Sequence, residues 1–249
     1  MSITDALQQE IVEGEILAVQ VGLWRTAVLA KTENGIRCGL AASLSNQDAR
    51  NKKLFAVKDA GRLHTKGYRE LAAMIDSTSQ TEASIGLATI NALLPAEPLP
   101  FIEENASKYL TEHCSGKKIA LIGHFPFIEL LRGKFQNLWV FELNPRDDDL
   151  PAALAPEYLP QADVVVLTAT TLVNHTFEGL MPYCQNATRV LMVGPSTPIS
   201  SVMFNSGLTT LSGTIVLKPE ETLLGIGQAG SMHALQEQGY VRQVTTEKV

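Results

Sequence analysis

Four short apolar runs, each ending in a polar turn, constrain the fold of this chain more than any other feature. They lie at 117–123, 137–145, 162–171 and 188–198. None alternates between apolar and polar residues, so each is expected to be a strand buried on both faces. Helices must then cover both sides of a parallel sheet, which predicts a doubly wound α/β domain.

The first run continues as KKIALIGHFP, from Lys117 to Pro126. It predicts a strand, a tight turn at Gly123 and a helix that starts near the proline. This order resembles the first unit of a dinucleotide-binding fold, in which free backbone N–H groups at the helix start face a ligand. The glycine fingerprint G-x-G-x-x-G is missing, so a nicotinamide or flavin dinucleotide is the less favoured ligand.

A proline-rich segment, PAEPLPF at 95–101, divides the chain. Three prolines forbid a helix there, and we place a domain boundary that gives domains 1–98 and 99–249. Upstream, two β-rich segments flank the turn residues Glu33-Asn34-Gly35, which predicts a hairpin. The N-terminal domain is therefore expected to be α+β.

Two helices are expected to follow this hairpin. In YRELAAMID the residues Tyr68, Leu71, Ala72 and Ile75 fall on one helical face. The stretch TEASIGLATINALL is apolar or small nearly all round, which predicts a helix buried on most sides, with Gly86 allowing close approach of another backbone.

A surface helix is expected where the second domain begins, over IEENASKYLTEH at 102–113. Its apolar face would carry Ile102, Ala106, Tyr109 and Leu110, with Glu104 and Lys108 on the polar face. Ser115-Gly116 is a signal for its end.

Composition limits the class of protein. The 249 residues carry a formal charge of −6, with no cluster of Lys and Arg, so a nucleic-acid partner is not expected. No apolar stretch is long enough to span a bilayer and no leader is visible, so we expect a cytoplasmic chain without a membrane partner. Cys38, Cys114 and Cys184 are widely spaced and are expected to be reduced thiols. A homo-oligomer is compatible with these features.

Polar residues gather where the predicted strands end, the edge at which such sheets bind ligands. The candidate ligand-binding residues there are Gly123, Phe125, Glu142, Thr168, Thr170, Asn174, Gly194, Pro195, Ser196 and Thr197. Glu142 lies about 20 residues past the first turn, where a carboxylate can grip ribose hydroxyls, although a strand-end acid can equally cap a helix. Thr168, Thr170 and Asn174 suit either an anion or ordinary helix caps.

Asn91 interrupts the buried helix and needs a hydrogen-bond partner, because an unpaired buried amide costs roughly 1–3 kcal/mol. That partner can be the neighbouring backbone or a ligand at the domain interface.

Five segments in this order, ASIGLATINALL, IGHFPF, ELNP, TATTLVNHT and VGPSTP, resemble the family described as putative heavy-metal chelation proteins. The resemblance covers most of the chain. It implies an N-terminal domain like that of enolase, a Rossmann-like second domain with partial likeness to methyltransferases, and a site between the two. It also implies a role in metal chelation or in making pterin-, flavin- or siderophore-like molecules. Ala169 and His175 depart from the family pattern, in which glycine is common at both positions.

Two hypotheses for function follow. In the first, an enzyme acts on a small anionic or heteroaromatic metabolite in the interdomain crevice, with His124 or His175 exchanging protons. In the second, a protein without catalytic activity binds a metal or a metal chelate. The histidines show no metal-ligand spacing, so the metal ligands and the cofactor are unknown at this stage. The run Asp147-Asp148-Asp149 is expected to be a solvated loop.

Overall fold

The computed structural model describes residues 1–44, 57–95 and 99–248. The N-terminal half holds an antiparallel sheet in the order β1-β2-β3. Its strands are β1 (Glu15–Val21), β2 (Arg25–Thr32) and β3 (Gly35–Ala42). Thr32 pairs with Gly35 across the β2–β3 turn, and Gly35 has the positive φ of 105° that such a turn requires. The predicted hairpin is confirmed.

Three helices accompany this sheet: α1 (Ile3–Glu10), α2 (Tyr68–Ala72) and α3 (Gln80–Leu93). Helix α3 begins at its N-cap Ser79 and buries ten of its fourteen residues, as its composition predicted. Leu71, Ala72 and Ile75 are buried together along α2 and the 3-10 turn that follows it. The residues that pack on α3 thus come from the segment predicted to form the neighbouring helix.

The C-terminal half holds a seven-stranded sheet in the order β10-β9-β8-β7-β4-β5-β6. Its strands are β4 (Lys118–Ile122), β5 (Asn137–Glu142), β6 (Leu150–Pro151), β7 (Val164–Thr168), β8 (Arg189–Val193), β9 (Thr210–Val216) and β10 (Val241–Glu247). All neighbours are parallel except β9 and β10. The four strands expected from the sequence are β4, β5, β7 and β8, and the order reverses between β4 and β7, as in a doubly wound sheet.

Burial on both faces is visible in the two apolar clusters that flank this sheet. Ile119 and Leu121 of β4 lie in one cluster, with residues of α4 (Ala106–His113) and α5 (Ile128–Leu131). Ala120 and Ile122 lie in the other. Alternate residues of one apolar strand therefore serve two cores, which is why the run shows no polar alternation.

The remaining helices of this half are α6 (Ala155–Tyr158), α7 (Thr170–Val173), α8 (Phe177–Leu180), α9 (Pro219–Gly227) and α10 (Met232–Glu237). Two expectations need correction. The helix after Pro126 is the single turn α5, which is followed by Gly133 with φ of 73°. Helix α4 starts at Ala106, because Asn105 caps it by accepting the Lys108 N–H at 2.9 Å, so Ile102 lies outside it and pairs with Thr245 instead.

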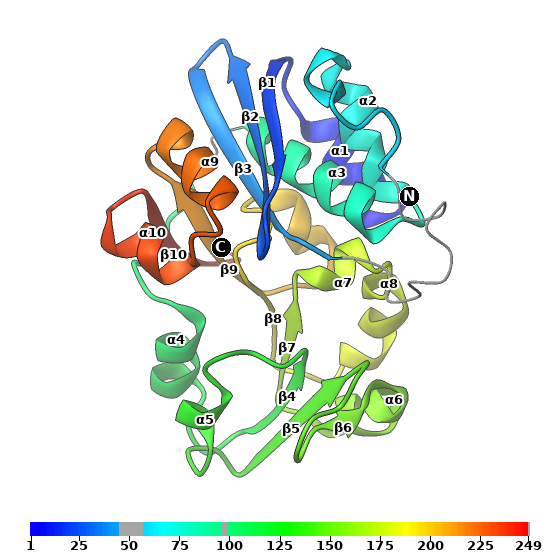
Figure 1. The fold of residues 1–249 in the computed structure, drawn as a ribbon. Coiled ribbons are helices and arrows are strands. Elements are labelled where there is room, and N and C mark those ends of the chain that lie inside the picture. Colours follow the sequence, from blue (N-terminus) through cyan, green and yellow to red (C-terminus); the bar gives the residue numbers. More distant parts are fainter. Residues whose placement is uncertain (45–56, 96–98, 249) are drawn as a thin grey trace.

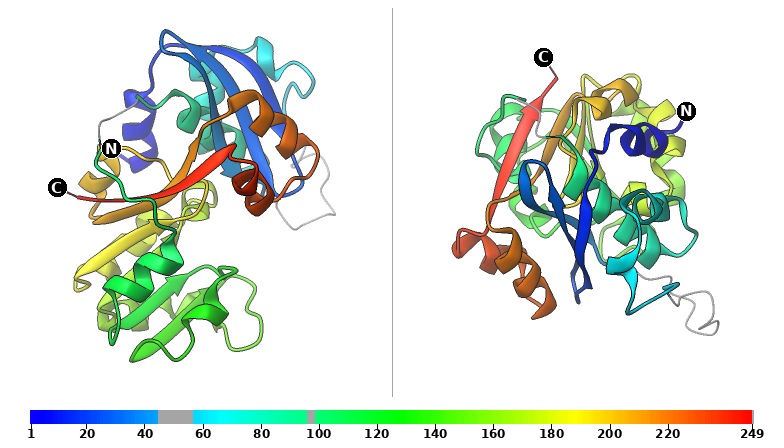
Figure 2. Two further views of the ribbon diagram at one scale, coloured as in Figure 1. Left: turned by 90° about the vertical axis from the view of Figure 1, so that its left-hand side faces the viewer. Right: turned by 90° about the horizontal axis from the view of Figure 1, so that it is seen from above.

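The N-terminal half sits over the carboxyl ends of the parallel strands (Figure 1). Its sheet is covered by α3 on one side and by α9 of the other half on the opposite side (Figure 2). Leu29 and Leu40 share a core with Ile226 and Leu235 there. The boundary at residue 98 stays a prediction, and the two halves pack against each other through shared apolar cores.

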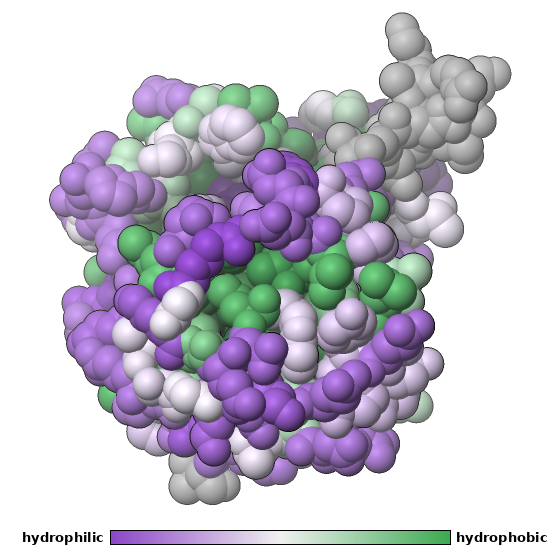
Figure 3. Space-filling model, turned by 90° about the horizontal axis from the view of Figure 1, so that it is seen from below, coloured by the Kyte–Doolittle hydropathy of each residue, from purple (hydrophilic) through white to green (hydrophobic). Residues whose placement is uncertain are grey.

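The face turned away from the N-terminal half carries a band of apolar residues across its middle, with hydrophilic residues around it (Figure 3). This face lies opposite the strand ends that carry the candidate site. None of the described helices is long and apolar enough to cross a lipid bilayer.

Candidate functional site

The predicted strand-end residues form a continuous row along one edge of the sheet. Gly123 has φ of 108°, its N–H donates to the Phe141 carbonyl at 2.8 Å, and an added Cβ would press on the Thr168 side chain. Thr168 in turn pairs with Val193, the residue before Gly194. The ends of β5, β4, β7 and β8 therefore lie side by side, as the α/β sheet requires.

The Glu142 carboxylate accepts hydrogen bonds from two backbone N–H groups. One carboxylate oxygen accepts the N–H of His124 at 2.9 Å, and the other accepts the N–H of Leu143 at 2.9 Å. Both oxygens therefore accept backbone N–H groups in the turns after β4 and β5, and neither caps a helix, since α5 begins at Ile128 without a side-chain cap. A carboxylate oxygen has a second lone pair, so a ligand hydroxyl can still be accepted beside each N–H.

His124 is held by a second acid that the sequence did not single out. Its Nδ1 lies 2.8 and 3.0 Å from the two carboxylate oxygens of Asp149, whose side chain is only 2% exposed. Asp149 also accepts the N–H of Arg146 at 3.2 Å. The expectation of a solvated loop is therefore wrong for Asp149, because the turn at Asp147, with φ of 47°, directs the third carboxylate inward.

The pairing with Asp149 fixes the chemistry of the imidazole. An ionised carboxylate can only accept, so Nδ1–H donates, and in the neutral ring Nε2 is left as an acceptor. The His124 side chain is 27% exposed, so part of the ring is accessible to solvent. Such an arrangement suits a general base whose ring is kept in one orientation.

The other predicted residues on the β4 and β7 turns have structural partners. Phe125 is buried in the core beside α5 and stacks on Phe127 at 5.1 Å. Thr168 Oγ1 accepts from the hydroxyl of Thr170 at 3.1 Å, and Asn174 Oδ1 accepts from the hydroxyl of Thr176 at 2.7 Å. These contacts lie within the turns and are not helix caps, because in the described structure neither the four-residue α7 nor α8 has a side-chain hydrogen bond at its N-cap.

His175 lies apart from His124. Its backbone φ is 59°, and its Nε2 donates to the carbonyl of Ile75 at 2.8 Å, since a carbonyl can only accept. Its surroundings include Ser2, Asp76 and Glu178, next to α1. The two histidines proposed for proton exchange therefore do not share a site.

Asn91 and Ser196 join the halves at the open edge of β3. The Asn91 amide donates to the carbonyls of Leu40 and Ser196, both at 2.9 Å. Ser196 Oγ accepts the N–H of Ala42 at 2.7 Å. Residues 40 and 42 present their free backbone groups on the same edge of an outer strand, so these two side chains close an edge that would otherwise be unpaired.

A cavity of about 150 Å³ lies beside this junction. Asn91 and Arg37 line it from the N-terminal half, and Pro195, Thr197 and Thr214 line it from the C-terminal half. Within the described part of the chain, Asn91 Oδ1 and Thr197 Oγ1 are buried and have no hydrogen-bond partner. The structure thus brings Asn91, Pro195 and Thr197 together, while the His124 end of the row lies beyond β7.

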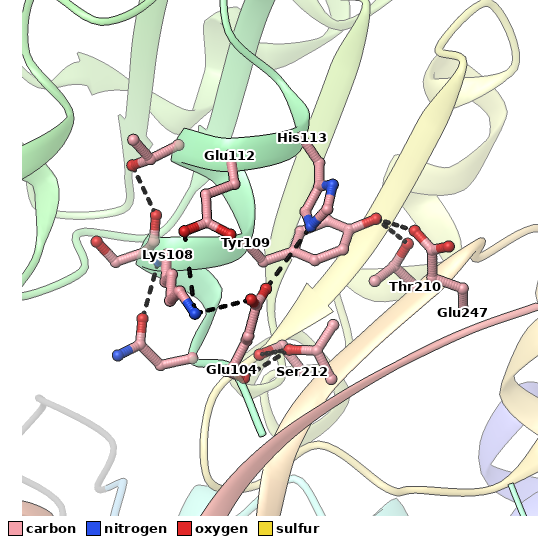
Figure 4. Close-up of polar contacts among 12 residues, drawn as sticks. Glu104, Lys108, Tyr109, Glu112, His113, Thr210, Ser212 and Glu247 are labelled. Atoms are coloured by element: carbon pink, nitrogen blue, oxygen red, sulfur yellow. Dashed lines mark hydrogen bonds and ion pairs between the residues drawn. The ribbon is translucent and has the colours of Figure 1, made fainter. Parts of the chain in front are cut away.

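A second group of ligating side chains gathers at α4. Ligand atoms of Glu104, Glu112 and His113 lie within 4.8 Å of one another. Figure 4 shows Glu104 between Lys108 and His113, with Lys108 Nζ at 2.9 Å from Glu104 and 3.9 Å from Glu112. One Glu104 oxygen, Oε2, is buried, has no hydrogen bond to any described residue, and lies 3.6 Å from His113 Nε2. The hydrogen bond from Lys108 lowers the pKa of Glu104.

The three cysteines are free, as expected, and all three are buried. Burial raises the pKa of Cys38 to about 12 and that of Cys184 to about 11, so their thiolates are scarce at neutral pH. Soft metals prefer several convergent thiolates, and these cysteines do not supply them.

Three residues of these sites were not predicted as site residues, because no local sequence motif distinguishes them. Asp149 is one of three consecutive aspartates, Arg37 is a strand residue beside a turn, and Glu104 precedes its helix. For Glu104 the sequence offered its place beside Lys108 on the polar face of the expected helix, and the two side chains form an ion pair at 2.9 Å.

Fold and site together define a two-part α/β protein, with a Rossmann-like half whose strand ends are covered by an N-terminal antiparallel sheet. Family models match residues 4–94 and 105–245, both described as "Putative heavy-metal chelation". The chain belongs to this family, and the resemblance of its five segments is confirmed.

Similar proteins support this assignment. The chain is 30% identical over 176 residues to an uncharacterized protein of Methanocaldococcus jannaschii, which is 67% of each chain. A crystal structure of a family member of unknown function from Desulfitobacterium hafniense matches with a TM-score of 0.80 and 26% identity over 99% of this chain and 98% of that one. A Pyrococcus horikoshii structure, at 20% identity with the same TM-score and coverage, shares the fold.

Proposed function

We propose that this chain binds a small anionic or heteroaromatic metabolite, of pterin-, flavin- or siderophore-like chemistry, in the crevice between its two halves. One observation carries the proposal: Asn91 and Thr197, one from each half, line one cavity, and the buried atoms Asn91 Oδ1 and Thr197 Oγ1 lack a partner among the described residues. An unpaired buried polar atom costs roughly 1–3 kcal/mol, so a ligand or an ordered water is needed to pair with them.

The size of the cavity limits what it can enclose. A cavity of about 150 Å³ in a protein core accepts a molecule the size of benzene, which has about six heavy atoms. The cavity would therefore hold the head group of a metabolite, and a larger ring system would extend out of it along the strand ends.

His124 would serve such a ligand at its other end. Only β7 separates β4 from β8, so His124 lies roughly two strand spacings, or about 10 Å, from the turn after β8. With Asp149 holding its Nδ1, the free Nε2 would accept a proton from a ligand of that length. Under this proposal any catalysis is proton transfer by His124, and His175 takes no part.

Replacing Thr197 with valine tests the proposal, since valine has the same shape and no hydroxyl. Thermal-shift titrations of metal-stripped protein would use adenosine nucleotides, S-adenosylmethionine, pterins and flavins. A ligand at about 100 times its Kd stabilises the native state by about 2.7 kcal/mol. We expect Thr197→Val to weaken the ligand that binds by roughly tenfold, because one hydrogen bond in a dry site is lost.

The matched control is Thr188→Val, which removes an exposed hydroxyl that donates to the Asp163 carbonyl at 2.9 Å. Equal affinities for the wild type and Thr197→Val would place the ligand elsewhere and overturn the proposal.

A second candidate function is binding of a divalent metal at Glu104, Glu112 and His113. Two carboxylates and an imidazole suit zinc or manganese, and the orphaned Glu104 Oε2 is an available ligand atom. Lys108 opposes metal binding, because the Lys108 ammonium already lies between the carboxylates of Glu104 and Glu112. A metal would have to displace that ammonium.

Lys108→Met and His113→Ala should therefore change the zinc affinity in opposite directions. Removing the competing charge should raise zinc affinity by about tenfold, whereas His113→Ala should lower it by a similar factor. Isothermal titration calorimetry with zinc chloride on metal-stripped protein measures both. His233→Ala is the control, because His233 is an exposed histidine beside Glu237 at 3.3 Å. Unchanged zinc binding in Lys108→Met would exclude this cluster as the metal site.

A further inference from the structure

The interdomain cavity contains a cation whose charge nothing else in the described structure balances. Arg37, on β3, lines the cavity and is half-buried. One of its N–H groups donates to the carbonyl of Leu94, at the end of α3. Within residues 1–44, 57–95 and 99–248, no ion pair includes Arg37.

Its surroundings make this charge costly. Loss of hydration through burial lowers the pKa of the Arg37 guanidinium, and no carboxylate among the described residues offsets that effect. Arginine stays protonated in proteins, so the charge remains and favours a nearby anion. The guanidinium has five N–H donors, and the Leu94 carbonyl engages one nitrogen of the fork.

The remaining polar atoms of the cavity define the rest of the ligand. The Asn91 amide nitrogen is already used on two carbonyls, so this side chain offers only its Oδ1, which can only accept. Thr197 is 3% exposed, and its hydroxyl, which has no hydrogen-bond partner among the described residues, can donate or accept. A complementary ligand must therefore bring negative charge for Arg37 and an N–H or O–H donor for Asn91.

A bare metal ion does not meet these requirements. The positive charge of Arg37 repels it, and Cys38, also in the cavity wall, keeps its proton because burial raises its pKa to about 12. Gly39 leaves no space beside α3 for a further ligating side chain, since an added Cβ would overlap the backbone of Ala88 and Ala92.

We propose that Arg37 is the anion-binding residue of the interdomain cavity, and that its ligand is a small carboxylate or phosphate carrying a hydrogen-bond donor next to the charge. This inference rests on the proposed function, because it names the chemical class of the molecule bound at that site. About six heavy atoms fit, which is the size of a simple amino acid or of a metabolite's charged head group.

Four small molecules test separately whether the ligand needs a negative charge and whether it needs a hydrogen-bond donor. Glycine has both a carboxylate and an N–H donor, acetate has only the carboxylate, and glycinamide has only the donor and no negative charge. Inorganic phosphate has a tetrahedral charge and an O–H donor, which distinguishes a phosphate site from a carboxylate site. Affinities would be measured by isothermal titration calorimetry on the full chain.

We expect glycine or phosphate to bind more tightly than acetate and glycinamide. Arg37→Met should weaken that anion by about tenfold or more and leave glycinamide unchanged, because a hydrogen bond to a charged group is lost. Arg37→Lys keeps the charge and should restore part of the affinity. Arg62→Met is the control for overall charge, since the Arg62 side chain is 76% exposed.

The outcomes separate this inference from the proposed function. If Thr197→Val weakens binding while Arg37→Met does not, the cavity is the site and Arg37 is not its anion receptor. If neither variant affects a probe that binds the wild type, both are overturned. If neither anion binds the wild type, the role of Arg37 is overturned, and the proposed function is decided by the metabolite titrations of Thr197→Val. A thermal melt of Arg37→Met accompanies each titration, so that loss of the Leu94 contact is not mistaken for loss of the ligand.

Discussion

Gly86→Ala should destabilise this protein by about 2 kcal/mol or more, although alanine is the better helix former. Gly86 lies in the middle of α3, and an added Cβ would overlap the backbone nitrogen of Ile75 in the turn after α2. Backbone cannot move aside as a side chain can, and overpacking of this kind costs typically 1–3 kcal/mol or more. The gain in helix propensity is only about 1 kcal/mol, so the steric term prevails.

Gly179→Ala is the matched control for this change. Gly179 lies within helix α8, is exposed, and has no atom near the position of an added Cβ. Here only the propensity term operates, so the melting temperature should stay the same or rise slightly. Gly86→Ala should lower it by roughly 4–8 °C, at about 2–4 °C per kcal/mol for a chain of this size. Equal behaviour of the two variants would disprove the close backbone contact at Gly86.

Asn91→Leu should cost about 3 kcal/mol through loss of the junction between the halves. Leucine fills a similar volume and leaves the carbonyls of Leu40 and Ser196 without their 2.9 Å donor. Each carbonyl left unpaired costs roughly 1–3 kcal/mol, and the added apolar surface recovers part of this. Urea unfolding of the variant measures the loss.

The control and a coupling test sharpen this prediction. Asn186→Leu removes an exposed amide that donates to the Pro160 carbonyl at 3.2 Å, and it should cost less than about 0.5 kcal/mol. Ser196→Ala removes the acceptor for the Ala42 N–H on the same strand edge. If the two side chains close one edge together, the loss in free energy of unfolding of the double variant should differ by about 0.5 kcal/mol or more from the sum of the losses of the two single variants. Strict additivity would mean that they act independently.

The sequence determined the elements whose signal is local. Unbroken apolar runs marked β4, β5, β7 and β8, because a strand buried on both faces needs apolar residues throughout. Asn34-Gly35 marked the β2–β3 hairpin through its need for positive φ. The small residues of α3 predicted both the burial of this helix and the close approach of another backbone at Gly86. Five segments in order were enough to indicate the family.

Elements without a strong local signal were not predicted. β9 contains Ser212 and Gly213, and β10 carries Arg242 and Gln243, so neither shows an apolar run. They form strands because they pair with each other across the edge of the sheet. Their stability comes from contacts between distant segments, which propensity does not record.

The row of strand-end residues was predictable in the same way as the strands, since parallel strands end at one edge of the sheet. The partners of those residues were decided only by the tertiary structure. Asp149 turns inward to His124, Asn91 reaches the turn after β8, and Arg37 faces a cavity that exists only where the halves meet. A side chain's charge and hydrogen-bonding capacity are written in the sequence, but its partners depend on which distant segments pack against it, and burial sets the energy of each pairing.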